Sequence, residues 1–451
     1  MITRTLIKDL PDCAGKEVTI QGWVDVRRDQ GKMIFFDFRD RSGKVQGVVL
    51  PASSALETAK TLRHEYVVEV TAKVNARPPK NVNEKVQNGA IELEVLEIKV
   101  LAEAESLPFD MSESGYNLDL TTELDHRALT LRHSRNQAIF KIQAVIIDSF
   151  REYMKSQDFL EFQAPSITPA TAEGGAEVFE VQYFDKKAYL SQSPQLYKQI
   201  VMSAFERVFS VNKIFRAEPS ATTRHLTEVV SLDAEWAFIK SWEDIRDMSE
   251  NTVRFILQQL AIQCSVELEH LKAELPVLLE HTPTMTLTEA QEKIFTSNGR
   301  DVRGDKDLNA EDERILCDIV KKETGSDFVY VYGYPTKQKP FYVYPNPENP
   351  EFNEGVDLLC RGREWLSGGR RINDYKQLMQ HVKEWGMDPE KISMFLEAFR
   401  YGVPPEGGFA FGAERMTMQI LGLENIREAT MFPRDMNRID SSLNQIDPTT
   451  M

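Results

Sequence analysis

The sequence predicts an α+β protein in two parts, a small β-barrel followed by a large domain in which strands and helices alternate. The chain has 451 residues, about three times the length of a typical single domain. Short β-rich runs fill its first hundred residues, whereas apolar residues recur at helical spacing from Ser134 onward. We therefore expect a barrel at residues 1–104, a hinge at 105–130 and the large domain at 131–451.

Glycine, proline and asparagine divide the first hundred residues into five β-rich runs, at residues 18–26, 33–38, 45–50, 66–74 and 91–100. Five short strands in so small a segment are typical of a closed barrel such as the OB-fold. Another kind of β-barrel, or a β-sandwich, would produce a similar pattern and remains an alternative.

The large domain opens with a predicted helix of about twenty residues, because apolar side chains recur from Ile139 to Tyr153 at the 3.6-residue period. Residues 265–325 are more helical and more polar than their surroundings, so they are a possible insertion. Longer strands with an antiparallel look are expected at residues 188–191, 207–215, 230–238, 329–332, 341–343, 356–360 and 408–412.

The composition is that of an ordinary soluble globular protein, with 41% hydrophobic and 27% charged residues. Apolar runs are too short for a transmembrane helix, and charged residues near the N-terminus argue against a signal peptide. The four cysteines are far apart and form no CxxC pair, which disfavours a zinc ribbon or a disulfide framework. We expect a cytoplasmic protein without a membrane partner.

The net charge of −16 is spread unevenly along the chain. Residues 1–100 carry 16 Lys and Arg against 14 Asp and Glu, whereas the remaining residues carry 38 against 56. An RNA-binding surface is therefore expected first in the N-terminal segment. Local phosphate contacts elsewhere remain compatible with an acidic chain.

Two arginines flank a loop between strand-like runs at residues 215–238. Arg216 and Arg224 lie on either side of a Pro-Ser turn, and His225 follows the second arginine. Such a hairpin can hold a polyphosphate between its arms, since each guanidinium makes charge-assisted, often bidentate contacts with phosphate oxygens. An ordinary surface hairpin with ion pairs explains the spacing equally well.

Two glycine-containing segments farther along supply further candidates. At residues 407–422 a strand leads into a helix with Arg415 in its first turn, where helix-end amides favour anions. At residues 362–375, Glu364 and Ser367 offer the oxygen ligands that a phosphate-bound Mg²⁺ prefers, and Arg371 could enter a pocket. Taken alone, a glutamate and a serine are more often simply solvated.

Polar residues also gather upstream of the hairpin. Gln195 and Lys198 are three positions apart and would share one face if residues 193–199 are helical. Glu173 lies in a glycine-rich loop at residues 171–179.

In this order, the segments resemble those of the class II aminoacyl-tRNA synthetases, and most closely the aspartyl members in their shorter, archaeal-like form. The stretch FLEFQAPSIT resembles motif 1, whose proline at the dimer interface matches Pro165. The stretches FRAE, TTRHL and LDAEWAF together resemble motif 2, and GGFAFGAERMTMQILG resembles motif 3. The resemblance covers nearly the whole chain. It implies an ATP-dependent ligase that activates aspartate and transfers it to tRNA(Asp).

The resemblance also implies an N-terminal OB-fold that reads the anticodon, a catalytic domain on a six-stranded antiparallel sheet, and a homodimer. On the anticodon face it implies that Phe35 stacks on a base, Gln46 hydrogen-bonds it and Arg28 reaches a base or a phosphate. A stacked base contributes about 1–3 kcal/mol, and unpaired bases are what proteins read in RNA. Alternatively, Phe35 is a core residue, since Phe36 and Phe38 lie close by in the sequence.

For the amino acid, the resemblance implies that Lys198 and Arg371 hold the side-chain carboxylate of aspartate. Asparagine would leave these two cations without a negative partner, which can discriminate by about 10⁴. A lysine at this position is also typical of the aspartyl rather than the asparaginyl enzymes. The same resemblance assigns the substrate ammonium to Asp233 and Glu173, and further polar contacts to Ser193 and Gln195.

For the nucleotide, the resemblance implies that Arg216 contacts the α-phosphate of ATP and that Glu218 accepts a hydrogen bond from the adenine amino group. It assigns the outer phosphates to Arg224, His225 and Arg415, and Mg²⁺ to Glu364 and Ser367. The α-carboxylate of aspartate then attacks the α-phosphorus without a general base, because it is already anionic. A terminal ribose hydroxyl of the tRNA attacks the adenylate in the second step. Whether tRNA(Asn) is also a substrate stays open.

Several residues depart from the family pattern. Val229 stands where an aromatic residue is frequent, Arg370 and Asn373 are unusual, and Glu406 stands where histidine is common. These departures leave ATP affinity and amino-acid preference open. Two alternatives therefore accompany the aspartate–tRNA ligase: a paralogous adenylating ligase with another amino acid or acceptor, such as asparagine, and a catalytically silent RNA-binding protein. The retained arginines argue against the silent protein.

Overall fold

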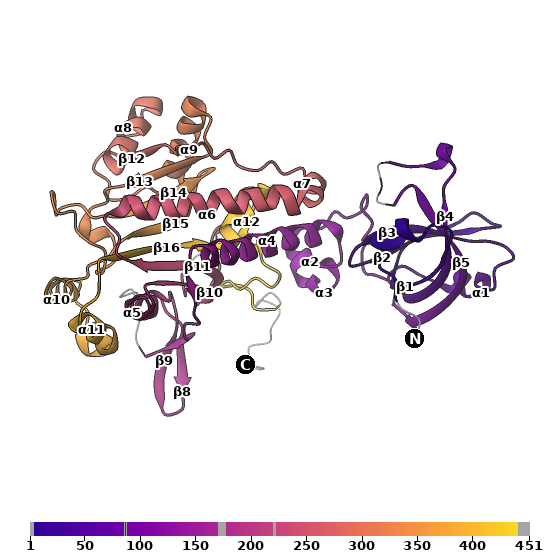
Figure 1. Ribbon diagram of the computed structural model, residues 1–451, viewed down its shortest axis with the longest axis horizontal. Coiled ribbons are helices and arrows are strands. Elements are labelled where there is room, and N and C mark those ends of the chain that lie inside the picture. Colours follow the sequence, from indigo (N-terminus) through magenta and orange to yellow (C-terminus); the bar gives the residue numbers. More distant parts are fainter. Residues whose placement is uncertain (1–3, 85, 87, 170–176, 220–221, 441–451) are drawn as a thin grey trace. The chain divides into compact units, whose positions relative to one another are not determined.

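The computed structural model describes residues 4–440 apart from positions 85, 87, 170–176 and 220–221 (Figure 1). The chain divides into two compact units, Met1–Asn117 and Leu118–Met451. Among the helices in the described ranges, none is long and apolar enough to cross a membrane.

The first unit is a closed barrel, whose described strands follow the order β1-β2-β3-β5-β4. Side chains alternate between the barrel interior and its outer surface, as the two-residue period of a strand requires. The predicted closed barrel is confirmed, and a sandwich is excluded. Its elements are η1 (Ile7–Cys13), β1 (Glu17–Asp29), β2 (Ile34–Asp40), β3 (Gly43–Val49), α1 (Leu56–Thr61), β4 (Val67–Ala76), η2 (Pro79–Asn81) and β5 (Ile91–Ala102).

The second unit is built on one large sheet, which has eight strands in the part of the chain that the structure describes. Six neighbouring strands, from β13 to β10 in the sheet order, are antiparallel. In sheet order the strands are β12 (Thr284–Thr286), β13 (Phe328–Tyr332), β14 (Gly355–Cys360), β15 (Arg363–Arg370), β16 (Glu406–Gly412), β11 (Glu228–Ala237), β10 (Arg207–Phe215) and β6 (Leu160–Glu161).

The expectation of a six-stranded antiparallel sheet is therefore wrong for the whole sheet. The strands β12 and β6 pair in parallel with its two edges. They are three and two residues long, too short to produce a period-two signal in the sequence.

Two other expected strands lie outside this sheet. Residues 188–191 overlap β9 (Lys186–Leu190), which joins β7 (Ile167–Thr168) and β8 (Glu180–Tyr183) in a small separate sheet. Residues 341–343 are not a strand, because only Val343 makes an isolated bridge, to Arg371. Their apolar side chains are buried in a core against helices instead, and apolar content alone does not distinguish these cases.

One face of the large sheet carries the main hydrophobic core. The predicted long helix is confirmed as α4 (Ser134–Ser156), and it packs on this face together with α6 (Trp242–Gln263) and α12 (Ala413–Leu421). In β11 the side chains of Leu232, Ala234 and Trp236 point into this core. The alternate residues of β11 therefore point to the opposite face, which α5 (Gln195–Phe205) covers (Figure 1).

The remaining helices surround the sheet. Within residues 265–325, α7 (Ser265–Leu271) joins the main core, whereas α8 (Leu287–Asn298) and α9 (Ala310–Thr324) form a smaller core against β13. Residues 105–130 contain α2 (Leu120–Asp125) and α3 (Arg127–Thr130). The other elements are η3 (Thr336–Gln338), α10 (Tyr375–Glu384), η4 (Pro389–Ile392), α11 (Ser393–Arg400) and η5 (Ile426–Ala429).

Candidate active site

The open face of the sheet brings together residues from distant parts of the sequence. Strand pairing aligns Asp233 with Ala410, Ala410 with Ser367, and Ser367 with Asp357 in one row across β11, β16, β15 and β14. Neighbouring strands lie about 4.8 Å apart, so Asp233 and Ser367 are about 10 Å apart across the sheet. This row is the floor on which the predicted amino-acid and nucleotide residues meet.

Two of the predicted cations meet at one buried carboxylate. Lys198 Nζ lies 3.1 Å from Asp233 Oδ1 and 3.1 Å from Glu235 Oε2. Arg371 Nε donates to Glu235 Oε1 at 2.8 Å. The structure thus places Lys198, Asp233 and Arg371 in one cluster with Glu235. We call these four residues the buried charge cluster.

Glu235, which the sequence analysis did not single out, contacts both of these cations. It lies two positions after Asp233 in β11, so both carboxylates point to the same face of the sheet. The alternation of polar and apolar residues in LDAEW was the signal that could have found it. Gly408 makes room for it, because a Cβ at this position would collide with Glu235 Oε2 and with the Ala234 carbonyl.

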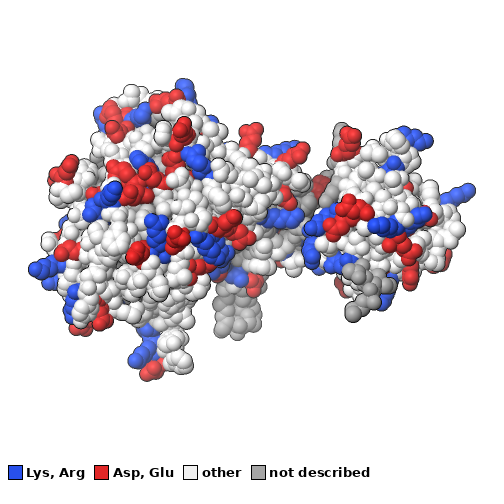
Figure 2. Space-filling view, viewed as in Figure 1, with Lys and Arg blue, Asp and Glu red and all other residues white. Residues whose placement is uncertain are grey.

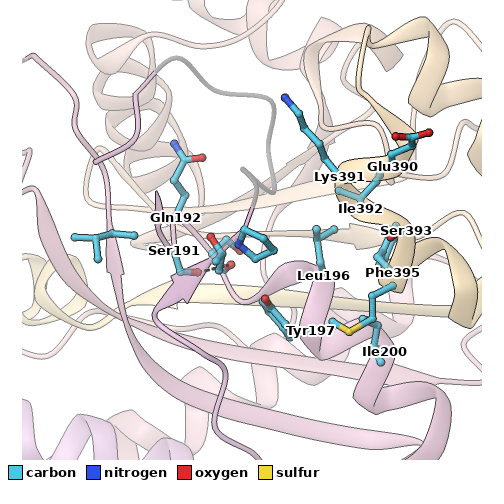
Figure 3. Close-up of a pocket in the computed structure, with 15 residues that line it drawn as sticks. Ser191, Gln192, Leu196, Tyr197, Ile200, Glu390, Lys391, Ile392, Ser393 and Phe395 are labelled. Atoms are coloured by element: carbon cyan, nitrogen blue, oxygen red, sulfur yellow. Dashed lines mark hydrogen bonds between the residues drawn. The ribbon is translucent and has the colours of Figure 1, made fainter. Parts of the chain in front are cut away.

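The helix α5 positions Lys198 because its polar face, rather than its apolar face, is turned toward the sheet. One of its faces presents polar, buried Gln195, Lys198 and Gln199 to the sheet. Its opposite face, with Leu196 and Tyr197, lines a cavity of about 330 Å³ beside η4 and α11 (Figure 3). The cavity is therefore separated from the buried charge cluster by the body of α5.

Ser193 lies at the junction of these two regions. Its Oγ accepts a hydrogen bond from the Gln195 backbone amide at 3.2 Å, and its side chain also lines the cavity. Gln195 Nε2 donates to Gln199 Oε1 at 3.1 Å, so this predicted polar contact is part of a network within α5. Glu173, the remaining predicted ligand of the substrate ammonium, lies outside the described residues.

Burial and charge shape the protonation of the cluster. Burial alone would raise the pKa of Glu235, but the positive charges of Arg371 and Lys198 outweigh it and lower that pKa. Burial raises the pKa of Glu406 well above its usual value, and the negative charge of Glu235 raises it further. The surroundings thus shift the pKa values of Glu235 and Glu406 in opposite directions.

The predicted phosphate-binding residues form a second group, which we call the cationic group. The side chain of Glu218 lies between Arg216 Nη1 at 3.9 Å and His225 Nε2 at 3.6 Å. Burial lowers the pKa of His225, and the nearby charges of Arg224, Arg415 and Arg216 lower it further against the opposite effect of Glu218. These residues therefore share one electrostatic environment.

Arg415 completes this group from the first turn of α12. Its Nη1 donates to Glu364 Oε1 at 3.0 Å and to the Glu364 carbonyl at 2.9 Å. Our sequence analysis missed Arg363, whose pKa is lowered by burial and then by the charge of Arg224. Its Nε is buried without a hydrogen-bond partner among the described residues, as expected of a donor whose partner is a bound anion. Its position one residue before Glu364 was the available signal.

The two donors predicted for Mg²⁺, Glu364 and Ser367, lie on the same strand, β15. Glu364 pairs with Arg415, and Ser367 is exposed on the sheet floor opposite Asp357. Among the residues that the structure describes, no three His, Cys, Asp or Glu side chains are grouped closely enough to hold a metal. One carboxylate and one hydroxyl fit an ion that phosphate oxygens and water also ligate, since Mg²⁺ usually keeps several such ligands.

A buried lysine lies next to these donors. Lys339 Nζ lies 2.6 Å from Asp357 Oδ2, and burial raises the pKa of Glu313 to about 7, with the charge of Glu364 as the next cause. Carboxylates that raise one another's pKa favour a cation, so this edge of the site is suited to a metal-bound phosphate.

Residues 119–436 match a protein family described as tRNA synthetases class II (D, K and N). The chain belongs to the class II aminoacyl-tRNA synthetases. Residues 18–101 match the OB-fold nucleic acid binding domain, which agrees with the barrel. The predicted family is therefore confirmed.

The relatives of this synthetase cover nearly its whole length. It is 40% identical over 448 residues to an aspartate–tRNA(Asp/Asn) ligase of Deinococcus radiodurans, which covers 97% of this chain and 99% of that protein. It is 37% identical to an aspartate–tRNA(Asp) ligase of Pyrococcus furiosus, over 94% of this chain and 96% of that one.

Solved structures include both amino-acid types. The asparaginyl-tRNA synthetase of Pyrococcus horikoshii, complexed with asparaginyl-adenylate, matches with a TM-score of 0.89 and 33% identity over 97% of this chain and 100% of that chain. A putative aspartyl-tRNA synthetase of Leishmania major Friedlin matches with a TM-score of 0.88 and 30% identity over 97% of this chain and 94% of that chain.

The residues that depart from the synthetase pattern lie around the site. The Arg370 guanidinium lies 4.2 Å from the ring centroid of Tyr344, outside the charge cluster, and Asn373 Nδ2 donates to the Val403 carbonyl at 3.2 Å. Val229 packs against a small hydrophobic core beside α12. Of these departures, only Glu406 touches the buried charge cluster.

In the barrel of the synthetase, the three predicted anticodon residues share the outer surface of β1, β2 and β3. Phe35 is paired with Arg28 across β1 and β2 and is partly exposed, whereas Phe36 and Phe38 are buried in the core. Arg28 makes a bidentate contact with Asp37, and Asp37 is paired with Gln46 across β2 and β3. The alternative that Phe35 is a core residue does not agree with this burial.

The surface charge explains how an acidic chain can still meet RNA. Figure 2 shows basic and acidic side chains interspersed on this face of each unit. A surface with both signs interspersed leaves room for local phosphate contacts by single cations, despite the negative net charge of the chain.

Proposed function

We propose that this chain is an aspartate–tRNA ligase that activates L-aspartate with ATP and transfers it to the 3′ end of tRNA(Asp). Its relatives at 36–40% identity are named aspartate–tRNA ligases. The observation that carries the proposal within the chain is the meeting of Lys198 and Arg371 at Glu235. Two buried cations side by side are what the second carboxylate of aspartate needs.

The buried charge cluster accounts for the selection of aspartate. With Lys198, Arg371, Asp233 and Glu235 all ionised, its net charge is zero. The substrate ammonium binds on the side of Asp233, and the side-chain carboxylate shares the two cations with Glu235. Because an ammonium and a carboxylate enter together, the site accepts aspartate without gaining net charge.

The cationic group serves the nucleotide. Arg216 contacts the α-phosphate, Glu218 accepts from the adenine amino group, and Arg224, His225 and Arg415 hold the outer phosphates. We add Arg363 to this set, since a buried Nε without a partner is suited to an anionic ligand. The anionic α-carboxylate of aspartate attacks the α-phosphorus and pyrophosphate leaves, so catalysis consists of positioning and electrostatic stabilisation.

Glu364 and Ser367 would hold Mg²⁺ together with phosphate oxygens and water. The ion would neutralise phosphate charge when bound. Glu364 also holds Arg415 at 3.0 Å, so the same carboxylate orients one of the phosphate-binding arginines. Lys339 Nζ donates a hydrogen bond to Asp357 Oδ2 beside them, at 2.6 Å.

We further propose a cytoplasmic homodimer that pairs through the segment around Pro165. Leu160 and Ile167 flank this proline and are each 46% exposed, as expected for residues that a second copy would cover. The outer barrel surface with Phe35, Gln46 and Arg28 would bind the anticodon of tRNA(Asp). Binding of tRNA(Asn) as well is supported by relatives that are named for both tRNAs.

Activation of asparagine is the second candidate, because solved asparaginyl-tRNA synthetases match the fold with TM-scores up to 0.89. The two cations argue for aspartate, since the neutral amide of asparagine would give Lys198 and Arg371 no negative charge beyond that of the protein itself. Pyrophosphate exchange with each of the twenty amino acids decides between them. We expect the fastest exchange with aspartate, followed by charging of purified tRNA(Asp). Fastest exchange with asparagine would contradict the proposal.

A further inference from the structure

Glu406 is a buried carboxyl group that the mechanism above does not use. It is the first residue of β16 and is 0% exposed. Its backbone carbonyl accepts the amide of Arg371 at 2.9 Å, and its Oε1 accepts Gln199 Nε2 at 2.6 Å. Its Oε2 is buried and has no donor beside it in the part of the chain that the structure describes.

The carboxylate of Glu235 lies against Glu406, within hydrogen-bond reach. Two ionised carboxylates in contact repel strongly when both are buried. Glu235 has two cationic partners, Arg371 at 2.8 Å and Lys198 at 3.1 Å, whereas Glu406 has the amide of Gln199. The proton of the pair therefore belongs on Glu406, whose Oε2 then gains the hydrogen-bond partner that it otherwise lacks.

The charges that face Glu406 show what this proton does. From β11 come Glu235 and Asp233, from α5 comes Lys198, and from the segment after β15 comes Arg371, which also lies 5.3 Å from the Tyr342 ring. With the proton on Glu406 the group is neutral, and without it the group carries one negative charge. A negative group repels the side-chain carboxylate of aspartate but not the amide of asparagine.

We propose that Glu406 is a specificity-determining positioning residue, which carries a proton, donates a hydrogen bond through it to Glu235 and thereby keeps the cluster open to the second carboxylate of aspartate. This inference rests on the proposed function. At an effective dielectric constant of about 20, one unit charge about 6 Å away changes an affinity about 100-fold. The proton on Glu406 therefore accounts for a preference for aspartate over asparagine of that size.

The test compares wild type with Glu406→Gln and Glu406→Leu in aspartate- and asparagine-dependent pyrophosphate exchange at pH 7. Glutamine keeps both hydrogen bonds and is always neutral, so its KM for aspartate should stay within about threefold of wild type. Leucine removes the donor to Glu235, so KM for aspartate should rise at least tenfold. In both variants kcat and KM for ATP should change less than about threefold.

Two outcomes would overturn the inference. A Glu406→Gln enzyme with an aspartate preference about 100-fold above that of wild type would mean that Glu406 is ionised. A Glu406→Leu enzyme with unchanged KM for aspartate would mean that Glu406 has no part in selection. Absence of aspartate-dependent exchange in wild type would instead refute the proposed function, and the inference with it.

A second readout does not depend on activity and covers the case in which the leucine variant fails to fold. The infrared carbonyl stretch of a protonated carboxylic acid should be present in wild type at pH 7 and should lose intensity in Glu406→Gln. The Glu414→Gln protein identifies the contribution of another buried glutamate whose pKa is raised by burial. An identical carboxylic-acid band in wild type and Glu406→Gln would contradict the proton on Glu406.

Discussion

At the amino-acid end of the site the side chains of Lys198 and Arg371 are 2% and 5% exposed, whereas at the nucleotide end those of Arg216 and Arg415 are 45% and 33% exposed. The first pair is tied to one buried carboxylate, Glu235. The second pair has carboxylate contacts at 3.9 Å and 3.0 Å near solvent. The first pair is thus neutralised inside the protein, whereas the second remains accessible from solvent, as the proposed binding of a small amino acid and of a larger polyanion requires.

This difference predicts unequal costs of mutation. A charge removed from the buried end leaves its partner without compensation at low dielectric, which is expensive. A charge removed from the exposed end is partly replaced by water and salt. Changes at the amino-acid end should therefore have larger and more selective effects than changes at the nucleotide end.

Arg371→Leu should produce the largest effect. It removes one of two cations that the aspartate carboxylate shares with Glu235, so kcat/KM for aspartate should fall about 10⁴-fold while KM for ATP changes little. Aspartate-dependent pyrophosphate exchange measures this. The matched control is Arg370→Leu, at the adjacent arginine that lies outside the cluster and 3.6 Å from Glu354.

The Arg371→Lys variant keeps the prediction testable if the leucine variant fails to fold. Lysine keeps the charge but loses the planar pair of donors, so an intermediate loss is expected. Equal losses in Arg371→Leu and Arg370→Leu would show that the buried cluster has no special part in aspartate binding.

Arg415→Ala should produce the next largest effect, a fall of about 10²–10³ in the rate of exchange, since it removes one preorganised cation from the developing phosphate charge. KM for aspartate should stay within a few-fold of wild type. The control is Arg303→Ala, another exposed arginine of the same unit, which pairs with Asp301. A rise in KM for aspartate as large as the loss of rate would break the division into two ends.

The sequence could predict those features that are determined by residues close together along the chain. The barrel, the long helix and the positions of Lys198 and Arg371 follow from local periodicity and from motifs of consecutive residues. Glu235 was missed because its contacts depend on Lys198, 37 residues earlier, and on Gly408, far along the chain, which leaves it space. The short edge strands β12 and β6 were missed because only their neighbours in the sheet make them strands.

Glu414 is a strongly buried acid of the second unit. Both its carboxylate oxygens lie within 3.1 Å of the Val230 amide, and burial raises its pKa to about 7. A raised acid pKa means that the folded state holds the proton more tightly than the unfolded state. Stability is therefore full below about pH 4.5 and falls by about 3 kcal/mol as the pH rises through 7.

Glu414→Gln removes this titration. Its thermal unfolding midpoint relative to wild type should therefore be higher at pH 8 than at pH 5, as differential scanning calorimetry of both proteins would show. A constant difference between the two proteins from pH 5 to pH 8 would mean that Glu414 is ionised throughout. The raised pKa assigned to Glu414 would then be wrong.

Phe35→Ala extends the comparison from the two ends of one site to the two units of the chain. Phe35 is partly exposed on the barrel, next to Arg28 in the strand register, so its loss should weaken tRNA binding by about 1–3 kcal/mol, or about 5- to 150-fold in KM for tRNA. Pyrophosphate exchange needs no tRNA and should be unchanged. The control is Tyr183→Ala, an exposed aromatic residue of the second unit. Equal loss of exchange and of tRNA charging in Phe35→Ala would place the defect in folding, and would remove the reason to assign this barrel surface to the anticodon.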